Sequence, residues 1–567
     1  MTGWTTTATG PAGELTFVVH RGDRAVLMAM DLPHNKVERL AGFALFRKSP
    51  GGSREPLLNR LDFKTPVTTA TTPEQRKWHP SDKAPFQKFR WVDVPSDFKN
   101  GDYEYSATAI YFAADGSLTA GDSASVTLDV SQKPATNLTV GFTRGYMSSQ
   151  AYADKFHNAP IEPPGKKSID FDTKPFQKQY AWLGFHAREL IASFLAECVA
   201  DNGITVDVFA YDLNEPDTIG ALKQLGSRLR LYLDNADLHI DHAPPGSPRH
   251  ALETDAEAAI AAAGGKVKRG HFRRFAHSKV FIARRNGTAF KVLTGSTNFS
   301  LRGLYVQANN VLVFDSPVVA GWFETAFETA WTNAGGFDQA DIAKHWFELP
   351  ADGLPAGAIA FSPHTSGDVS LKRVADAITA AGSSLLFSVM GLAGGGDVLK
   401  QLREGTAKPG MFSYGVTQSS TYMRLYKPGS ATPVTVPYAY LKDKVPQPFR
   451  AEISGGPGQV IHDKFVVVDF NGPNPIVYTG SSNLAAGGEK DNGDNLIELR
   501  GADVASLYMV DAVRQIDHFH FRAAMKDATK ADPLVLKGPT EWHKWVDPYY
   551  DPNDLKFLDR ELFARSG

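Results

Sequence analysis

The sequence predicts an α/β protein made of two related halves, preceded by an all-β sandwich. Three observations lead to this prediction. Short strand-like segments fill residues 1–131, helical and apolar strand patterns alternate from residue 137 to 535, and the order of elements in that second region occurs twice. At 567 residues, 42% apolar and 22% charged, the chain is long enough for about two to four domains.

The N-terminal region, residues 1–136, is predicted to be an accessory β-sandwich of the immunoglobulin or fibronectin type. Its segments are short, rich in β-branched and aromatic residues, and separated by clusters of Gly, Pro, Asp and Asn. The clearest of them are 14–20, 42–48, 89–94, 103–112 and 125–130. No group of titratable residues in this region indicates catalysis.

The two related halves are expected at residues 137–350 and 351–535. Each contains a helical pattern, an apolar strand, a loop and a second helical pattern, and both second helices contain Leu-Lys-Gln-Leu. These segments are 186–200, 204–211 and 219–225 in the first half, and 374–382, 383–391 and 397–405 in the second. The aromatic tail, residues 536–567, is expected to pack on the two halves.

Composition and charge exclude several classes of protein. A net charge of −2, from 60 Lys and Arg against 62 Asp and Glu, argues against a surface that binds anions everywhere. Neither a secretory signal nor an apolar run of about 18 residues is visible, so a cytoplasmic location is the default expectation and non-classical export stays open. The single cysteine, Cys198, lies on the apolar side of a helical pattern and is interpreted as a buried structural thiol.

Seven residue identities recur at the same spacing in the two halves. A His, a Lys two positions later, and a Thr-Gly-Ser-x-Asn turn occur in both, with 17 residues from His to Thr and 21 from His to the Asn of the turn. A further Asn follows each His by 33 positions. The residues are His277, Lys279, Thr294, Gly295, Ser296, Asn298 and Asn310 in the first half, and His462, Lys464, Thr479, Gly480, Ser481, Asn483 and Asn495 in the second. So many matches at fixed offsets are not a coincidence.

Geometry gives these identities a chemical meaning. A His and a Lys two positions apart at the start of a strand project to the same face of the sheet. The turn adds a hydroxyl and an amide, and its glycine lets the backbone come close. If the halves meet about a pseudo-twofold axis, two His, two Lys and two Asn converge. That arrangement predicts a site for a tetrahedral anion.

These motifs resemble those of the phospholipase D superfamily, whose signature is His-x-Lys-x4-Asp followed by a Gly-Ser-x-Asn turn. The second copy matches fully and includes Asp469, whereas Arg284 stands at the acidic position of the first copy. The segment 211–216 also resembles the family's loop after the first strand. The resemblance covers the two halves, about 400 residues, and not the N-terminal sandwich.

The resemblance implies a metal-independent phosphodiesterase that forms a phosphohistidine, with His277 as nucleophile and His462 as general acid and base. The residues expected to hold the phosphoryl oxygens are Lys279, Lys464, Asn298 and Asn483, with Gly295, Ser296, Gly480 and Ser481 at the substrate. Glu498, 36 residues after His462, is a candidate carboxylate for orienting an imidazole; Val313 stands at its position in the first copy, where Asp315 is the nearest substitute. No metal or other cofactor is expected, because two Lys and two Asn can neutralise the substrate.

Two substrate classes stay open. Two-copy chains of this length resemble phospholipases more often, which favours a phospholipid headgroup as substrate and contact with a membrane surface. The basic stretch at residues 266–274, which includes an aromatic, favours nucleic acid as the alternative. Binding without turnover is disfavoured, because both His-x-Lys pairs are intact. A monomer is expected, since one chain holds both motif copies.

Overall fold

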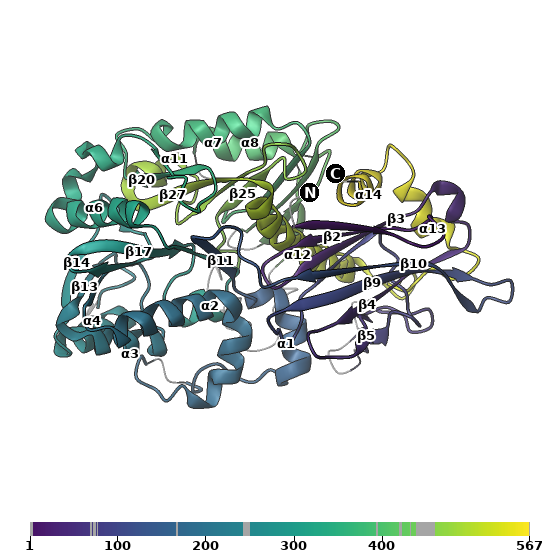
Figure 1. The fold of residues 1–567 in the computed structure, drawn as a ribbon, viewed down its shortest axis with the longest axis horizontal. Helices are drawn as coiled ribbons and strands as arrows, with labels where there is room; N and C mark the ends of the chain where they lie inside the picture. Colours follow the sequence, from purple (N-terminus) through teal and green to yellow (C-terminus); the bar gives the residue numbers. More distant parts are fainter. Residues whose placement is uncertain are drawn as a thin grey trace.

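The computed structural model describes residues 4–68, 71, 75, 77–165, 168–241, 250–392, 395–418, 422–430, 432–437 and 460–565. The N-terminal sheets lie at one end of the molecule and the two halves at the other (Figure 1). The long helix α12 (Ala502–Asp527) runs through the middle and contacts both parts.

The N-terminal region forms two four-stranded antiparallel sheets, with the strand orders β1-β2-β3-β8 and β10-β9-β4-β5, and a separate two-stranded sheet, β6-β7. All five segments predicted as strands are strands. Both sheets contribute to one core, for example Phe17 and Met28 from the first and Phe43 and Tyr105 from the second. The assignment to an immunoglobulin or fibronectin sandwich stays a prediction. The strands are β1 (Thr5–Thr9), β2 (Thr16–Arg21), β3 (Val26–Asp31), β4 (Leu40–Lys48), β5 (Arg54–Pro56), β6 (Leu58–Asn59), β7 (His79–Pro80), β8 (Arg90–Asp93), β9 (Asp102–Phe112) and β10 (Leu118–Asp129).

The first half is built on a sheet of order β11-β18-β17-β16-β12-β13-β14, in which β12, β13 and β14 run parallel and the other neighbours antiparallel. Its strands are β11 (Leu138–Phe142), β12 (Ile204–Ala210), β13 (Leu229–Asp234), β14 (Lys266–Gly270), β16 (Val280–Arg285), β17 (Thr288–Gly295) and β18 (Asn310–Phe314). Its helices are α1 (Ser149–Phe156), α2 (Gln177–Ala200), α3 (Pro216–Leu225), α4 (Leu252–Ala262), α5 (Leu301–Tyr305) and α6 (Pro317–Asn333).

The second half has a sheet of order β19-β20-β27-β26-β25-β21-β22-β23-β24, to which the short strand β15 (Phe275–Ala276) of the first half is added through β27. Its strands are β19 (Phe347–Glu348), β20 (Gly357–Ser362), β21 (Ser384–Ser388), β22 (Phe412–Gln418), β23 (Tyr422–Tyr426), β24 (Val434–Pro437), β25 (Phe465–Val468), β26 (Ile476–Gly480) and β27 (Asn492–Arg500). Besides α12, its helices are α7 (Asp368–Ala380), α8 (Asp397–Gly405) and α11 (Ala486–Asp491).

The two sheets have the same topology. The run β11-β18-β17-β16-β12-β13 corresponds strand for strand to β20-β27-β26-β25-β21-β22, and in both the last pair is parallel. The internal repeat read from the sequence is therefore a repeat of structure. It follows that equivalent motif residues occupy equivalent places in the two sheets.

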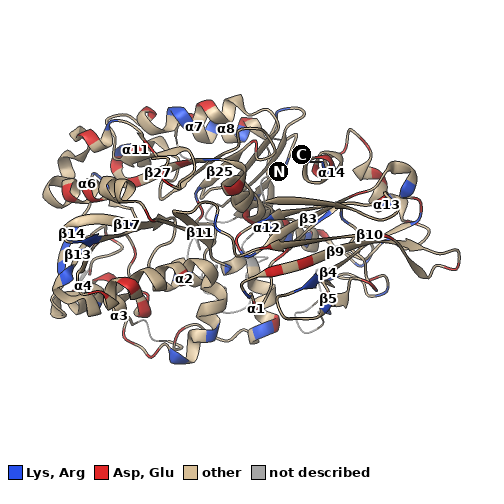
Figure 2. Ribbon diagram, viewed as in Figure 1, with Lys and Arg blue, Asp and Glu red and all other residues tan. Residues whose placement is uncertain are grey.

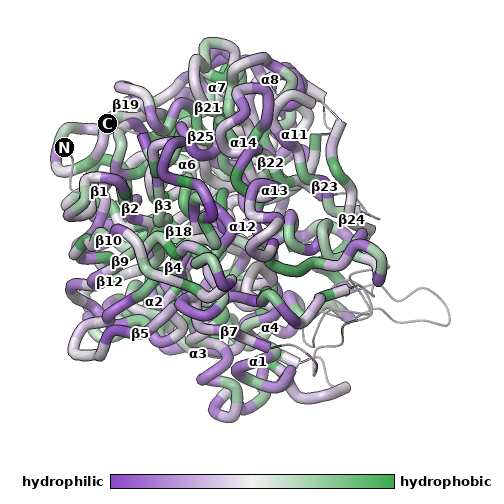
Figure 3. The backbone as a smooth tube through the Cα atoms, turned by 90° about the vertical axis from the view of Figure 1, so that its right-hand side faces the viewer, coloured by the Kyte–Doolittle hydropathy of each residue, from purple (hydrophilic) through white to green (hydrophobic). Residues whose placement is uncertain are grey.

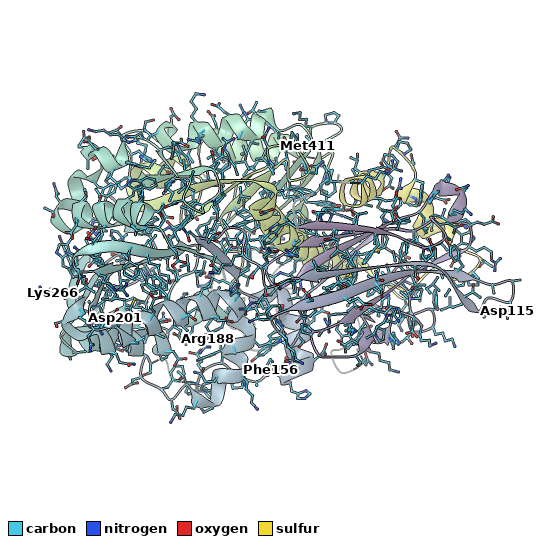
Figure 4. All side chains as sticks on the ribbon, viewed as in Figure 1. Asp115, Phe156, Arg188, Asp201, Lys266 and Met411 are labelled. Atoms are coloured by element: carbon cyan, nitrogen blue, oxygen red, sulfur yellow. The ribbon has the colours of Figure 1, made fainter. Side chains whose placement is uncertain are left out.

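Side chains fill the space between these layers (Figure 4), and hydrophobic and hydrophilic residues alternate along much of the chain (Figure 3). One large core joins both halves, and Cys198 lies in it on α2, where burial raises the pKa of its thiol to about 12. This confirms the interpretation of a buried structural cysteine. No helix among the described residues is long and apolar enough to span a membrane.

The C-terminal tail contains α13 (His543–Val546) and α14 (Leu555–Ala564), and it packs against two parts of the protein. Trp545 lies in the core of the N-terminal sheets, and its indole donates a hydrogen bond to the carbonyl of Leu40 at 3.1 Å. Phe563 contacts the ring of Phe412 in the second half. The helix α14 thus contacts both the second half and the first N-terminal sheet, where His20 and Arg90 bind it, whereas α13 packs on the N-terminal sheets.

The anchoring role of α13 gives a stability prediction. Trp545→Ala removes a nearly buried indole from the core and should lower the free energy of unfolding by about 3 to 5 kcal/mol. Lys544→Ala, on the exposed side of the same helix, should change it by less than about 0.5 kcal/mol. Urea unfolding followed by circular dichroism checks both. Equal midpoints for the two variants would contradict the anchoring role.

Candidate active site

The two halves meet through a reciprocal backbone contact. Ala276 of β15 pairs with Gly493 of β27, and Ala308 forms a parallel bridge with Ile461. The two contacts are related by a shift of 185 residues (461 − 276 and 493 − 308), which is also the shift between the motif copies (462 − 277). The contact therefore has the pseudo-twofold symmetry expected from the repeat.

Both His-x-Lys motifs lie at this contact, just before β16 and β25 rather than within them. His277 is 5% exposed, and His462, Lys279 and Lys464 are 2% exposed or less. Each lysine ammonium donates a hydrogen bond to the carbonyl of the histidine in its own motif, at 2.6 Å for Lys464. The structure thus brings together the two imidazoles and the two ammonium groups that the sequence singled out.

Their electrostatics are those of crowded, buried cations. Burial lowers the pKa of Lys279 to about 8, and burial together with the charge of Lys279 lowers the pKa of Lys464 well below its usual value. Burial and both lysines also hold the pKa of His462 well below 6.5. An anion bound here would relieve the mutual repulsion, so the site favours an anionic ligand.

Each imidazole takes its hydrogen-bond partner from the opposite half. The Nδ1 atom of His277 lies 2.8 Å from Oδ1 of Asp494, and Nδ1 of His462 lies 2.9 Å from Oδ1 of Asn309. Each partner follows the other half's histidine by 32 positions (494 − 462 and 309 − 277). Sequence reasoning missed both residues, although they directly precede the recurring Asn at offset 33.

The two partners differ in charge, and this makes the histidines unequal. Burial and the charge of Lys279 lower the pKa of His277, but the Asp494 carboxylate opposes them. The amide of Asn309 is oriented by two further bonds: Ser296 Oγ donates to its oxygen at 2.8 Å, and its nitrogen donates to the carbonyl of Gly303 at 2.9 Å. A neutral oxygen therefore faces His462.

The glycines of the two turns are required by their surroundings. Gly295 and Gly480 have φ angles of 139° and 124°, which residues with side chains rarely adopt. A Cβ atom would lie 2.4 Å from the carbonyl oxygen of Asn310 in the first turn and 2.5 Å from that of Asn495 in the second. The glycines thus serve close packing of β17 on β18 and of β26 on β27.

The serines and asparagines of the turns have different environments. Ser296 Oγ and Ser481 Oγ accept hydrogen bonds from the backbone N–H groups of Asn310 and Asn495, both at 3.0 Å, so these hydroxyls hold the turns. Their contact with substrate stays a prediction.

The side-chain oxygens of the turn asparagines are buried and lack a hydrogen-bond partner among the described residues; these are Asn298 and Asn483.

The recurring Asn at offset 33 joins the two halves. The amide nitrogen of Asn310 donates to Asp463 at 2.9 Å, and that of Asn495 to Ser278 at 3.5 Å, so each contacts the residue between His and Lys of the other motif. Burial and the nearby Asp511 raise the pKa of Asp463 to about 7. These contacts explain the recurrence of the Asn without a direct catalytic role.

Asp469 does not contact the histidines. It follows β25 and accepts hydrogen bonds from the backbone N–H groups of residues 382–384, including Ser384 at 2.9 Å. At its equivalent position Arg284 pairs with Glu324 at 2.7 Å. Five residues of extended chain separate Asp469 from Lys464, about 16 Å. The acidic position of the motif therefore holds the end of a strand and lies away from the imidazoles.

The prediction that Glu498 orients an imidazole is wrong. Its carboxylate binds Arg373 and Arg500, with nitrogen to oxygen distances of 2.7 Å. Asp315, the substitute considered for the first copy, pairs with Lys291 at 3.1 Å on the surface. Both acids lie on strands or turns near the motifs in sequence, but their partners are structural cations.

The segment 211–216 contributes an aromatic wall to the site. The ring of Tyr211 meets the imidazole of His277 edge to face, with centroids 4.8 Å apart, and Lys279 Nζ lies 5.0 Å from the same ring. Burial raises the pKa of the tyrosine hydroxyl, so it stays neutral at ordinary pH. This ring restricts the side-chain conformations open to both residues of the first motif.

Among the described residues, one group of side chains has the spacing of a metal site. Ligand atoms of Asp212, His239 and Glu253 lie within 4.8 Å of one another. Both ring nitrogens of His239 are already hydrogen-bonded, however, to Asp234 and Asp212 at 2.8 Å each. These bonds account for the arrangement without an ion.

Comparison with known proteins finds similarity at the level of structure. No family model and no curated protein matches the sequence. Phosphatidylserine synthase from Haemophilus influenzae is similar with a TM-score of 0.37 and 14% identity over 66% of this chain and 91% of that one. Polyphosphate kinase from Porphyromonas gingivalis is similar with a TM-score of 0.36 and 9% identity over 58% of this chain, which spans 48% of the kinase's length.

A third similar structure is described as a phospholipase D family member, Nuc from Salmonella typhimurium, with a TM-score of 0.21 and 22% identity over 26% of this chain and 87% of that one. All of these TM-scores are below 0.5 and all identities below 25%. The resemblance to the phospholipase D superfamily therefore rests on the two motif copies and on their convergence in the fold.

Proposed function

We propose that this protein is a phosphodiesterase of the phospholipase D type, which hydrolyses or transfers a phospholipid headgroup through a phosphohistidine on His277. The observation that carries the proposal is the convergence of two buried His-x-Lys pairs, one from each half. A phosphodiester is anionic and resists attack until its charge is neutralised. Two ammonium groups beside two imidazoles supply that neutralisation and a nucleophile in one place.

The environment of His277 suits a nucleophile. Because Nδ1 is bonded to the Asp494 carboxylate, its proton stays on that nitrogen and the lone pair of Nε2 is available. Attack forms an Nε2–P bond and breaks the P–O bond to the leaving group. The imidazole ring then carries positive charge, which the carboxylate of Asp494 stabilises.

The environment of His462 suits a general acid. Its Nδ1 faces the neutral amide oxygen of Asn309, so an imidazolium at this position is less stabilised than one beside a carboxylate and gives up its proton more readily. Burial and the neighbouring lysines lower the pKa of His462, and an anionic substrate bound beside them would favour its protonation.

The proposed reaction has two steps, formation and hydrolysis of the phosphohistidine. In the first, His462 transfers its Nε2 proton to the leaving oxygen while the phosphohistidine forms. In the second, His462 takes a proton from water, the water oxygen bonds to phosphorus, and the P–N bond to His277 breaks. An alcohol can replace water in the second step, which gives transfer of the phosphoryl group.

The preference for lipid over nucleic acid as substrate rests on the contacts of the basic residues. In the basic stretch 266–274, Lys268 and Arg269 donate to backbone carbonyls of the protein itself, and Arg273 pairs with Asp338 at 2.6 Å. These groups are thus engaged within the fold. Acidic and basic residues are interspersed over the ribbon in the view of Figure 2.

The substrate prediction is tested with dispersed lipid. The protein should release headgroup from phosphatidyl lipids in mixed micelles and, with a primary alcohol present, form the phosphatidyl alcohol. Mass spectrometry of the lipid products measures both, and His277→Ala prepared in parallel controls for contaminating activity. Absence of lipid turnover under all dispersal conditions, with DNA cleaved at about micromolar enzyme or below, would identify a nuclease instead.

The roles of the histidines are tested by trapping the intermediate in excess EDTA. Loss of either imidazole should slow turnover by at least about 10²- to 10⁴-fold. With a ³²P-labelled p-nitrophenyl diester, whose leaving group needs no proton, His462→Asn should accumulate labelled protein and His277→Asn should not. Label on position 462 in the His277 variant would reverse the assignment. Activity that is lost in EDTA and restored by one metal would exclude the metal-free mechanism.

The role of Asp494 is tested against a matched carboxylate on the same strand. Asp494→Asn should slow formation of the intermediate by about 10²-fold or more, because the charge that stabilises the phosphohistidine is removed. Glu498→Gln should leave that step within about threefold but lower stability by about 1 to 3 kcal/mol, since it weakens the bonds to Arg373 and Arg500. Pre-steady-state release of p-nitrophenolate and thermal unfolding measure the two effects. Equal rate losses would exclude a specific role of Asp494.

A further inference from the structure

A chain of hydrogen bonds lies behind the first motif. Nδ1 of His239 is 2.8 Å from Oδ1 of Asp234, and Nε2 is 2.8 Å from Oδ1 of Asp212. The second oxygen of Asp212 accepts a hydrogen bond from Nδ2 of Asn298 at 2.7 Å. The second oxygen of Asp234 accepts one from the backbone N–H of Ala276 at 2.6 Å. The histidine therefore connects the residue before His277 to the amide of the Gly-Ser-x-Asn turn.

We infer that His239 is a positioning residue, which holds Asn298 and the peptide preceding His277 in the geometry for phosphoryl transfer by bridging Asp212 and Asp234. The inference rests on the proposed function, because it assigns a task to Asn298 at the same site. His239 touches neither the substrate nor the reacting atoms. Its effect is transmitted through the two aspartates.

The positive charge of His239 strengthens its hydrogen bonds to Asp212 and Asp234. His239 is 3% exposed and Asp234 is fully buried, so water competes little for these bonds. Burial lowers the pKa of His239, but the hydrogen bonds to Asp212 and Asp234 outweigh it and raise that pKa to about 9. At neutral pH both ring nitrogens then carry protons, and each donates to a carboxylate. Two charge-assisted bonds of this kind hold more strongly than neutral ones.

The other groups around the ring fit this assignment. The rings of His239 and Tyr211 meet at nearly a right angle, with centroids 4.5 Å apart. The guanidinium of Arg269 donates to the backbone carbonyl of His239 and so leaves the ring free for the aspartates. Burial and the charge of Asp212 raise the pKa of Glu253, and the negative charge of this neighbour also favours the protonated form of His239.

The bond from Asn298 to Asp212 fixes which end of the amide faces which way. Turning the amide by 180° would place its oxygen against the carboxylate of Asp212, which is unfavourable. One N–H of the amide is thus held by Asp212, and the other remains for a phosphoryl oxygen. Without His239, the carboxylate of Asp212 could rotate and release the amide. A displacement of about 1 Å at such a position can cost up to about 10²-fold in rate.

A double-mutant cycle on the full-length protein tests this. His239→Gln should lower kcat toward bis(p-nitrophenyl) phosphate by about 10- to 100-fold and change KM by less than about threefold. In the Asn298→Ala background the same substitution should have less than about threefold further effect, because the group it positions is gone. If the two substitutions lowered kcat independently, so that their fold-changes multiplied in the double variant, the inference would be overturned. The matched control is His250→Gln, an exposed histidine that also pairs with two aspartates, Asp241 and Asp255, and it should leave kcat unchanged.

Two further measurements keep the result unambiguous. If His239→Gln has a lowered thermal midpoint, Asp212→Asn, which keeps the shape of the side chain, replaces it in the same cycle. If the wild-type protein hydrolyses no diester, the proposed function fails; binding of orthovanadate then still tests the link, and His239→Gln and Asn298→Ala should weaken it non-additively. Zn²⁺ binding that requires His239 and restores activity after EDTA would make the group a metal site and overturn the inference.

Discussion

The reciprocal contact between the two halves is the constraint on which the site depends. Neither half contains a complete set of groups: His277 takes its carboxylate from the second half, and His462 takes its amide from the first. The backbone follows the same rule, since the N–H of His277 donates to Gly493 at 2.9 Å and that of His462 to Ala308 at 3.2 Å. A shift of one residue between the halves would turn side chains to the opposite face and break these bonds together.

This contact carries buried charge, which is unfavourable for folding unless it is compensated. Lys279 and Lys464 are almost inaccessible to water, and each makes ionisation of the other less favourable. Asp494 and Asp212 supply part of the compensation, because both interact with Lys279. The positive charge that these aspartates do not compensate can pair with an anionic ligand. A fold built only for stability would favour apolar side chains here, so the arrangement is best understood as a requirement of binding and chemistry.

The halves share a topology but differ in the groups around the two imidazoles. Asp494 of the second half corresponds to Asn309 of the first, so one histidine faces a charge and the other a dipole. The hydrogen-bond chain through His239 adds a second asymmetry, on the side of the first motif. A reaction with a nucleophile and a separate acid requires environments that make the pKa values of two similar groups different. The symmetry of the backbone brings the groups together, and the differences between the halves give the two imidazoles the unequal surroundings on which the proposed mechanism depends.

The strands of the N-terminal region, the helix and strand order of each half and the residues of both motifs are predictable from the sequence, because alternation, periodicity and repeat spacing are local properties. The side chain that binds each imidazole became evident only in the folded structure. Asp494 and Asn309 lie 217 and 153 positions from the histidines they bind, and spacing within one copy carries no information on contacts between copies. For that reason the offset from His462 led to Glu498, which lies on the same strand as Asp494 but, four residues and about 13 Å farther along, binds arginines instead.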